Sequence, residues 1–209
     1  MTGHGRGAAR LAKIGPHFVG GTGLSDTVSV GVTVTFLRMN APPTEPAPAL
    51  PPGTEVVHAS ECSVPFYRYL YNTVGADYVW WLRRTVPDQH LARLLSSPAV
   101  AIYVLYQNGE PAGFYELDSG RWPSVNLGYF GMMPHAVGTG MGHAFLRHAV
   151  DFVWRARPQA MTVNTCTADH PRALPGYKRV GFRVFREEFE HWDIPKSLGL
   201  TIPDRLILR

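Results

Sequence analysis

The chain has 209 residues, of which 45% are hydrophobic and 17% charged, and its formal net charge is +4 at pH 7. This length and composition predict one domain with a sizeable buried core. No run of eighteen apolar residues occurs, so we expect no membrane-spanning helix and no membrane partner. The basic residues form no cluster with interleaved aromatics, which disfavours nucleic-acid binding.

The two cysteines, Cys62 and Cys166, are too few for a disulfide scaffold. They form no metal-ligand spacing with each other or with the histidines, so we expect no bound metal. A reduced, cytoplasmic setting is the simplest interpretation.

The chain divides into three predicted segments. Residues 1–27 are interpreted as a flexible extension, because Gly15 and Pro16 interrupt any apolar stretch that could serve as a signal core. Residues 28–195 are expected to form the single domain, with a proline-rich loop at 41–53. Residues 196–209 are interpreted as a C-terminal tail.

In chain order, the alternation of valines from Val28 to Val34 predicts a half-buried strand. Ser63 is a candidate helix cap, and further helices are expected over 77–84 and from Asp88. Asn108-Gly109 has the residue types of a two-residue hairpin turn. It joins predicted strands 99–106 and 112–117, and the elements expected after them are a strand at 124–132, a helix at 141–155, a strand at 160–167, a helix at 172–180 and a strand at 182–192. This order predicts an α+β (mixed α/β) fold on one central sheet.

A glycine-rich turn, 130–142, leads from a predicted strand into a predicted helix. Gly138, Gly140 and Gly142 permit positive φ and leave no Cβ to block a ligand. The free N–H groups of a helix N-terminus and its macrodipole favour an anion there. The segment therefore predicts a phosphate or pyrophosphate site.

Three other interpretations of the turn compete with a phosphate site. A Walker-type loop is excluded, because no Lys-Ser or Lys-Thr follows the glycines. A dinucleotide fingerprint fits poorly, because the preceding strands form an antiparallel hairpin. The alternative that the turn only joins the strand to the helix, without binding a ligand, stays open.

Two motifs together carry a family resemblance. The first, His135-x-x-Gly138-x-Gly140, resembles the acetyl-CoA signature of the GNAT superfamily of N-acetyltransferases, which reads Gln or Arg, two residues, Gly, one residue, Gly or Ala. The second lies in 170–182, where Ala173, then Tyr177 four residues later, and a closing Gly-Phe resemble the second motif of that family. The resemblance covers roughly residues 60–192 in layout. His135 and His170 depart from it, standing where Gln or Arg and where Asn are usual.

The resemblance implies a GNAT-like, mostly antiparallel mixed sheet, splayed in the middle and flanked by helices on both faces. It also implies acetyl-CoA (coenzyme A) as the acyl donor, with pantetheine beside the strand and the pyrophosphate on the turn amides. The residues expected to bind the cofactor are Phe130, Gly131, Met132, Met133, His135, Val137, Gly138, Thr139, Gly140, Met141, Gly142, Asn164, His170 and Tyr177.

The resemblance further implies that an amine attacks the thioester directly. Tyr177 is then the candidate acid for the leaving thiolate, its alternative being a ring packed against the sheet. The family often has a Glu at the position of Asn126, which cannot take a proton. Glu116 is therefore the candidate base and a substrate contact, its alternative being a solvent-facing strand residue. Tyr71 is the candidate for the acceptor wall.

Two functional classes follow from this interpretation. The first is an N-acetyltransferase acting on a primary amine, either a small molecule or a peptide. The second is a catalytically inactive acyl-CoA-binding sensor or regulatory module of the same fold. This class stays open because Asn126 stands where a carboxylate is usual. The sequence leaves the acceptor and a homodimer undecided.

Overall fold

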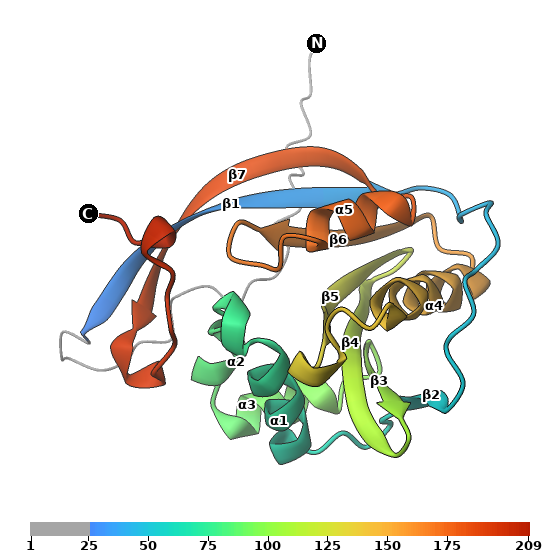
Figure 1. Ribbon diagram of the computed structural model, residues 1–209, viewed down its shortest axis with the longest axis horizontal. Helices are drawn as coiled ribbons and strands as arrows, with labels where there is room; N and C mark the ends of the chain where they lie inside the picture. Colours follow the sequence, from blue (N-terminus) through green and yellow to red (C-terminus); the bar gives the residue numbers. More distant parts are fainter. Residues whose placement is uncertain (1–25) are drawn as a thin grey trace, which may run out of the picture.

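The computed structural model describes residues 26–209, and their strands form one seven-stranded sheet in the order β2-β3-β4-β5-β6-β1-β7 (Figure 1). The strands are β1 (Thr27–Met39), β2 (Thr54–His58), β3 (Val100–Gln107), β4 (Glu110–Arg121), β5 (Ser124–Met132), β6 (Ala160–Cys166) and β7 (Arg183–Pro195). The helices are α1 (Val64–Val74), α2 (Leu82–Thr85), α3 (Asp88–Leu95), α4 (Met141–Arg155) and α5 (Ala173–Arg179), with 3-10 turns η1 (Ala76–Tyr78), η2 (Pro134–Ala136), η3 (Lys196–Leu198) and η4 (Asp204–Leu206).

The sheet is mostly antiparallel, and β5 and β6 form its parallel pair. Helices α1 to α3 lie on one side of β3–β5 and α4 lies on the other (Figure 1). The predicted α+β layout with helices on both faces is confirmed. Within residues 26–209, no helix is both long and apolar enough to cross a membrane.

Strand β1 has the predicted alternation, with Val30, Val32 and Val34 buried on one face. It pairs with β6 along one edge and with β7 along the other. The segment 196–209, expected as a tail, returns to this ribbon, where Ile207 forms a bridge with Val30. The extension predicted for 1–27 falls largely outside the described residues, and its last residue, Thr27, begins β1.

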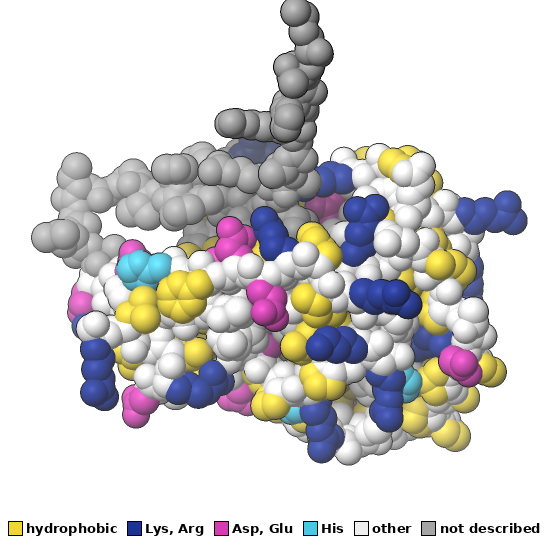
Figure 2. All heavy atoms as spheres, turned by 90° about the horizontal axis from the view of Figure 1, so that it is seen from above, with side chains coloured by type: hydrophobic (Ala, Val, Ile, Leu, Met, Phe, Trp, Pro, Cys, Tyr) yellow, Lys and Arg dark blue, Asp and Glu magenta, His cyan; other side chains and the backbone are white. Residues whose placement is uncertain are grey.

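Strand β7 forms the outer edge of the sheet and exposes large apolar side chains. Phe185 and Phe189 are 57% and 65% exposed. Figure 2 shows a face of the molecule from above, on which basic and acidic side chains are mixed with apolar ones.

Local signals predicted most elements correctly. Ser63 caps α1 by accepting the N–H of Phe66, and Asn108 and Gly109 have φ values of 51° and 89° in the β3–β4 turn. The loop 41–53 contains no helix or strand, as predicted, and the Arg147 side chain of α4 donates to the Glu45 carbonyl within it. Strand β2, just after this loop, was not predicted.

The helix predicted over 77–84 is wrong. The chain instead forms η1, then places Val79 at φ 57°, and begins α2 at Leu82. The break has a packing cause, because Val79 is buried in the apolar cluster beneath β1, whereas Trp80 packs against Tyr71 and Phe114 in the main core. Two adjacent side chains thus enter different clusters, which overrides helix propensity.

Strands β5 and β6 separate partway along their length. Ser124 to Leu127 pair with Ala160 to Val163, after which β5 continues along β4 alone and β6 along β1. The β4–β5 register also shifts between Glu116 and Leu117, which leaves Gly128 as an extra residue in β5. The sheet is therefore splayed in the middle, as the resemblance implied.

Close packing of α1 on β5 predicts different results for two glycines. A Cβ at Gly131 would lie 2.2 Å from Cγ1 of Val74, whereas one at Gly176 meets nothing within 4 Å. We expect Gly131→Ala to lower the free energy of unfolding by about 1–3 kcal/mol. Gly176→Ala should be neutral or stabilise by up to about 1 kcal/mol. Urea denaturation measures both changes. Val74→Ala should restore stability lost in Gly131→Ala. Equal stability of Gly131→Ala and Gly176→Ala would contradict this packing.

Candidate functional site

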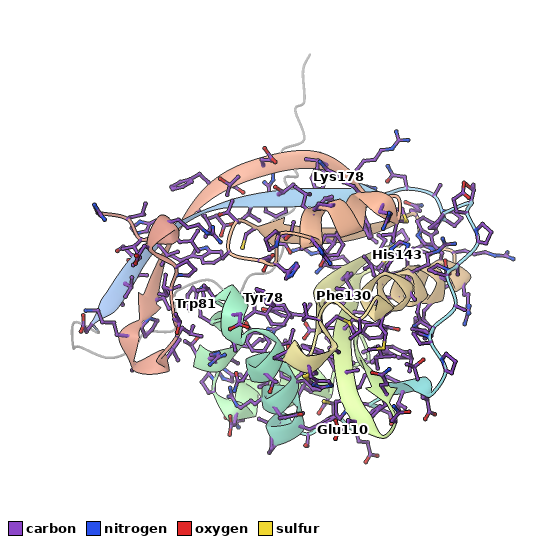
Figure 3. All side chains as sticks on the ribbon, in the orientation of Figure 1. Tyr78, Trp81, Glu110, Phe130, His143 and Lys178 are labelled. Carbon is purple, nitrogen blue, oxygen red and sulfur yellow. The ribbon has the colours of Figure 1, made fainter. Side chains whose placement is uncertain are left out.

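One open groove of about 2200 Å³ runs through the splayed part of the sheet. Small-molecule sites usually measure about 300–1,000 Å³, so the groove has room for two ligands. It extends from the start of α4 to β7 and passes Phe130 on β5. In Figure 3, Phe130 lies between Tyr78 and Trp81 on one side and His143 of α4 on the other, and all four line the groove.

The N-terminus of α4 opens onto this groove. Gly138 and Gly140 have φ values of 84° and 88°, and a Cβ at either would meet no atom within 4 Å. Gly140 is the N-cap, and no side chain caps the helix. The first N–H groups of α4 therefore have no intrahelical acceptor and no capping side chain, which is the geometry of an anion site.

The predicted cofactor residues fall into two groups. Ten of them line the groove: Phe130, Gly131, Met132, Val137, Gly138, Gly140, Gly142, Asn164, His170 and Tyr177. The predicted substrate contacts Tyr71 and Glu116 line it as well. The structure does not bring Met133, His135, Thr139 or Met141 to its surface; His135 is exposed on η2, and the side chains of Met133 and Met141 are buried.

Two residues whose backbone is expected to meet the cofactor already use those backbone groups inside the protein. The Val137 N–H donates to the Pro134 carbonyl at 3.3 Å, which closes η2. The Met133 N–H donates to Ala112 at 2.9 Å, and the Met133 carbonyl accepts from Ala136 at 2.9 Å. The amides left for a diphosphate therefore begin at Gly138.

Tyr177 lies near the C-terminal end of α5 and is 6% exposed. Its ring packs edge-on against Phe130 and Phe182, with centroids 6.5 and 6.1 Å apart. Burial and, to a smaller extent, the Asp169 carboxylate raise the pKa of Tyr177, so its hydroxyl keeps its proton at neutral pH. The ring of Tyr177 is therefore packed, as the alternative interpretation expects, and its role as proton donor stays a prediction.

Glu116 of β4 is 2% exposed, so the alternative of a solvent-facing residue is wrong. Its Oε2 accepts the Tyr67 hydroxyl at 2.5 Å, and its Oε1 accepts Nη2 of Arg83 at 2.8 Å. Burial, the largest single effect, lowers the pKa of Arg83, but Glu116, Tyr67 and Tyr129 together raise it by more, so the guanidinium stays charged. Arg83 and Glu116 form a buried ion pair in the part of the groove that Tyr71 also lines.

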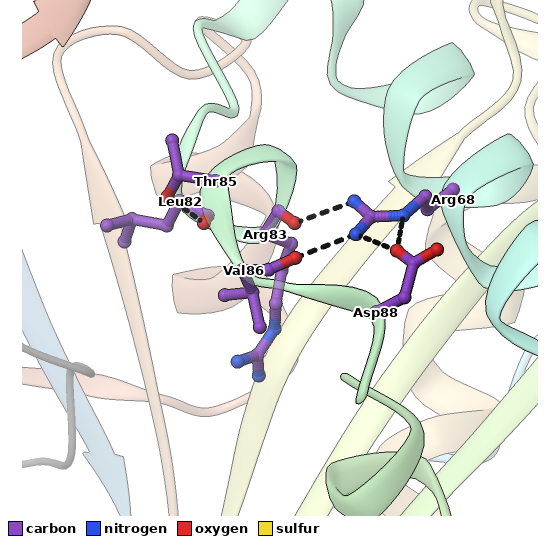
Figure 4. A network of polar contacts seen from close by, with 6 residues as sticks. All are labelled: Arg68, Leu82, Arg83, Thr85, Val86 and Asp88. Atoms are coloured by element: carbon purple, nitrogen blue, oxygen red, sulfur yellow. Dashed lines mark hydrogen bonds and ion pairs between the residues drawn. The ribbon is translucent and has the colours of Figure 1, made fainter. Parts of the chain in front are cut away.

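Arg68 of α1 holds the short helix that carries Arg83. Its guanidinium donates to the carbonyls of Arg83 and Val86 at 3.1 and 2.7 Å and pairs with Asp88 at 2.6 Å (Figure 4). Because α2 has four residues and no side-chain cap, these bonds fix its position.

Aromatic rings form the wall beside this ion pair. Tyr71 lies 5.2 Å from Trp80 and 5.0 Å from Tyr129 between ring centroids, and the Arg83 guanidinium lies 5.4 Å from the Tyr129 centroid. The Tyr71 hydroxyl accepts the backbone N–H of Arg83 at 3.2 Å. Tyr71 thus lies in the wall where it was predicted, and its contact with an acceptor stays a prediction.

Sequence reasoning missed three groove residues: Arg83, Tyr129 and Asp169. Asp169 follows β6, and its carboxylate accepts the Thr165 hydroxyl, the Cys166 N–H and the Trp80 indole N–H. None of the three residues belongs to a sequence motif, and only the fold brings them together. The His170 ring accepts the Arg172 N–H at 3.0 Å. Within residues 26–209, no group of three His, Cys, Asp or Glu side chains has the arrangement of a metal site.

The buried ion pair predicts a strong coupling between its partners. Arg83→Met should lower the free energy of unfolding by about 3–5 kcal/mol, because it leaves the Glu116 charge buried without a cation. Adding Glu116→Gln should recover most of this loss. Chemical denaturation of the two single variants and the double variant gives the coupling energy; strictly additive effects would contradict a direct pair.

Solved structures similar to this chain share its fold. A GCN5-related N-acetyltransferase from Sphaerobacter thermophilus aligns with a TM-score of 0.51 and 16% identity over 81% of this chain and 53% of the other. A tandem GNAT protein from the clavulanic acid biosynthesis pathway gives 0.57 and 13% over 80% and 55%. A Drosophila protein gives 0.60 and 13% over 83% and 54%. The chain thus spans little more than half the length of these three proteins.

Sequence comparisons give one family and no individual relative. No curated protein sequence matches the chain significantly. The profile of the family described as "Acetyltransferase (GNAT) domain" matches residues 77–195, more than half of the chain. This match includes β5, the glycine turn, α4 and α5, the elements that form the groove. The chain belongs to the GNAT acetyltransferases.

Proposed function

We propose that this protein is an acetyl-CoA-dependent N-acetyltransferase that acts on a primary amine of a small molecule or peptide in the cytoplasm. The observation that carries the proposal is the uncapped N-terminus of α4, which opens onto a groove between separated strands. Family membership supports acyl transfer in general.

The donor half of the groove suits a diphosphate attached to a long, uncharged arm. The amides from Gly138 to Gly142 and the macrodipole of α4 favour the anion. Beyond Leu127 and Val163, β5 and β6 no longer pair with each other. Phe130, Met132 and Asn164 therefore border a gap in which an extended arm replaces the missing strand contact.

Coenzyme A supplies an acetyl thioester, and two side chains of the protein handle the protons. As the amine nitrogen forms its bond to the acetyl carbon, the carbon–sulfur bond breaks. Tyr177 gives its hydroxyl proton to the leaving sulfur. Glu116 takes the proton that the amine loses, directly or through a water.

Glu116 is accessible from the groove because its neighbour on β5 is a glycine. A Cβ at Gly128 would lie 3.0 Å from Oε1 of Glu116. Each carboxylate oxygen has a second lone pair beyond the bond it already accepts. Arg83 and Tyr67 therefore orient Glu116 without using its full capacity as an acceptor.

The sensor hypothesis rests on Asn126, which stands where a carboxylate is usual. Asn126 Oδ1 accepts the Thr162 hydroxyl at 3.0 Å and so joins β5 to β6 just before they separate. This bond gives Asn126 a structural role that leaves catalysis to other residues. Thiol release from acetyl-CoA across a panel of amines separates the two classes, since a sensor releases none.

Coenzyme A binding tests the donor half directly. In calorimetry, coenzyme A should bind saturably and pantetheine, which lacks the diphosphate, at least tenfold more weakly. Gly140→Val should remove this difference, because it places a side chain and a strained φ at the anion site. Coenzyme A should also raise the melting temperature of the wild type. No saturation at millimolar coenzyme A would reject the proposal.

Two conservative substitutions test the proton transfers. Tyr177→Phe and Glu116→Gln should each lower kcat by about 10²–10⁴, the usual range for a positioned acid or base. Coenzyme A affinity should change less than about threefold, because neither group holds the diphosphate. Tyr69→Phe, at a tyrosine that is 49% exposed, is the matched control. Unchanged turnover in either variant removes that residue from the mechanism.

A further inference from the structure

Asp169 lies where the two halves of the groove meet. Its Oδ2 accepts two bonds from its own segment, the Thr165 hydroxyl at 2.7 Å and the Cys166 N–H at 2.9 Å. Its Oδ1 accepts a longer bond of 3.3 Å from the Trp80 indole, which lies across the groove from β6. Asp169 lines the groove, and its carboxylate thus joins the end of β6 to the segment that carries Trp80.

Among residues 26–209, no lysine or arginine forms an ion pair with the half-buried Asp169, whereas the buried Glu116 is paired with Arg83. Burial raises the pKa of Asp169, and its hydrogen bonds oppose that rise. A desolvated carboxylate without a counter-charge is costly, and such groups gather at functional sites.

The surroundings of Asp169 also favour a cation. Trp80 and Tyr129 stand with ring centroids 5.0 Å apart, and aromatic faces attract ammonium groups. Burial raises the pKa of Tyr129, Arg83 lowers it, and the charges of Glu116 and Asp169 raise it. Burial and, to a smaller extent, the charge of Asp169 also raise the pKa of Tyr177, the candidate proton donor.

We propose that Asp169, with Trp80 and Tyr129, binds the protonated ammonium group of the acceptor. One ammonium proton then passes to Glu116, and the second, lost as the amide forms, returns to Tyr177 in place of the proton that Tyr177 gives to the leaving sulfur. The ammonium donates to Oδ1 and replaces the neutral indole as the donor there, because a charge-assisted hydrogen bond is the stronger one. This inference rests on the proposed function and narrows its acceptor to amines that are cationic in neutral water. Weakly basic amines, which lack this charge, are expected to be poor acceptors.

Nuclear magnetic resonance tests this binding without knowledge of the natural acceptor. The protein, labelled with ¹⁵N and saturated with coenzyme A, is titrated with butylammonium and separately with 1-butanol. The Trp80 indole N–H signal is assigned by its loss in Trp80→Phe. We expect butylammonium to shift this signal saturably and 1-butanol to leave it in place. No shift, or an equal shift with the alcohol, would overturn the proposal.

Variants assign the effect to one carboxylate. Asp169→Asn should abolish the butylammonium shift, and Asp118→Asn, whose carboxylate accepts the Gly120 N–H of its own turn, should keep it. For the best amine in the thiol-release panel, Asp169→Asn should lower kcat/KM about 10- to 100-fold, mainly through KM. An undiminished shift or an unchanged KM in this variant would contradict the assignment.

Calorimetry on the same samples separates the two proposals. If coenzyme A binds while butylammonium causes no shift, the ammonium site fails and the proposed function stands. If coenzyme A itself does not bind, the proposed function fails first. Should Asp169→Asn not fold, the comparison of butylammonium with 1-butanol in the wild type still decides the question.

Discussion

Strands β5 and β6 pair over four residues and then part, each kept straight by its other neighbour. Strand β5 continues along β4, and β6 continues along β1. Neither strand can close the gap without giving up a ladder of hydrogen bonds on its far side. The opening is therefore built into the sheet, and a ligand with an extended polar arm can use the backbone edges that it exposes.

The two sides of this opening differ in chemistry because different elements supply them. On one side, α4 presents amides that its glycine turn leaves uncapped, which suits an anion. On the other, Trp80, between η1 and α2, donates to Asp169, and Arg83 of α2 donates to Glu116. Under the proposed function, a phosphate-bearing donor and a cationic acceptor approach from separate ends, and the acetyl group passes from one to the other.

Elements governed by local physics could be predicted from the sequence. The turn at Asn108-Gly109, the cap at Ser63 and the glycines before α4 each act through their own backbone, and all three were predicted. The helix over 77–84 failed because Val79 and Trp80 are buried in separate clusters. Arg83 lies 33 residues from Glu116 and Trp80 lies 89 residues from Asp169, and no periodic pattern encodes such pairs. Motifs thus predicted a donor site, whereas the pairing of Glu116 with Arg83 required the fold.

A crystal structure of the protein grown with coenzyme A would test the central claim most directly. The account predicts electron density for the pantetheine arm between β5 and β6, with the diphosphate against the amides from Gly138 to Gly142. Density for coenzyme A elsewhere on the surface, with the gap between the strands unfilled, would contradict it.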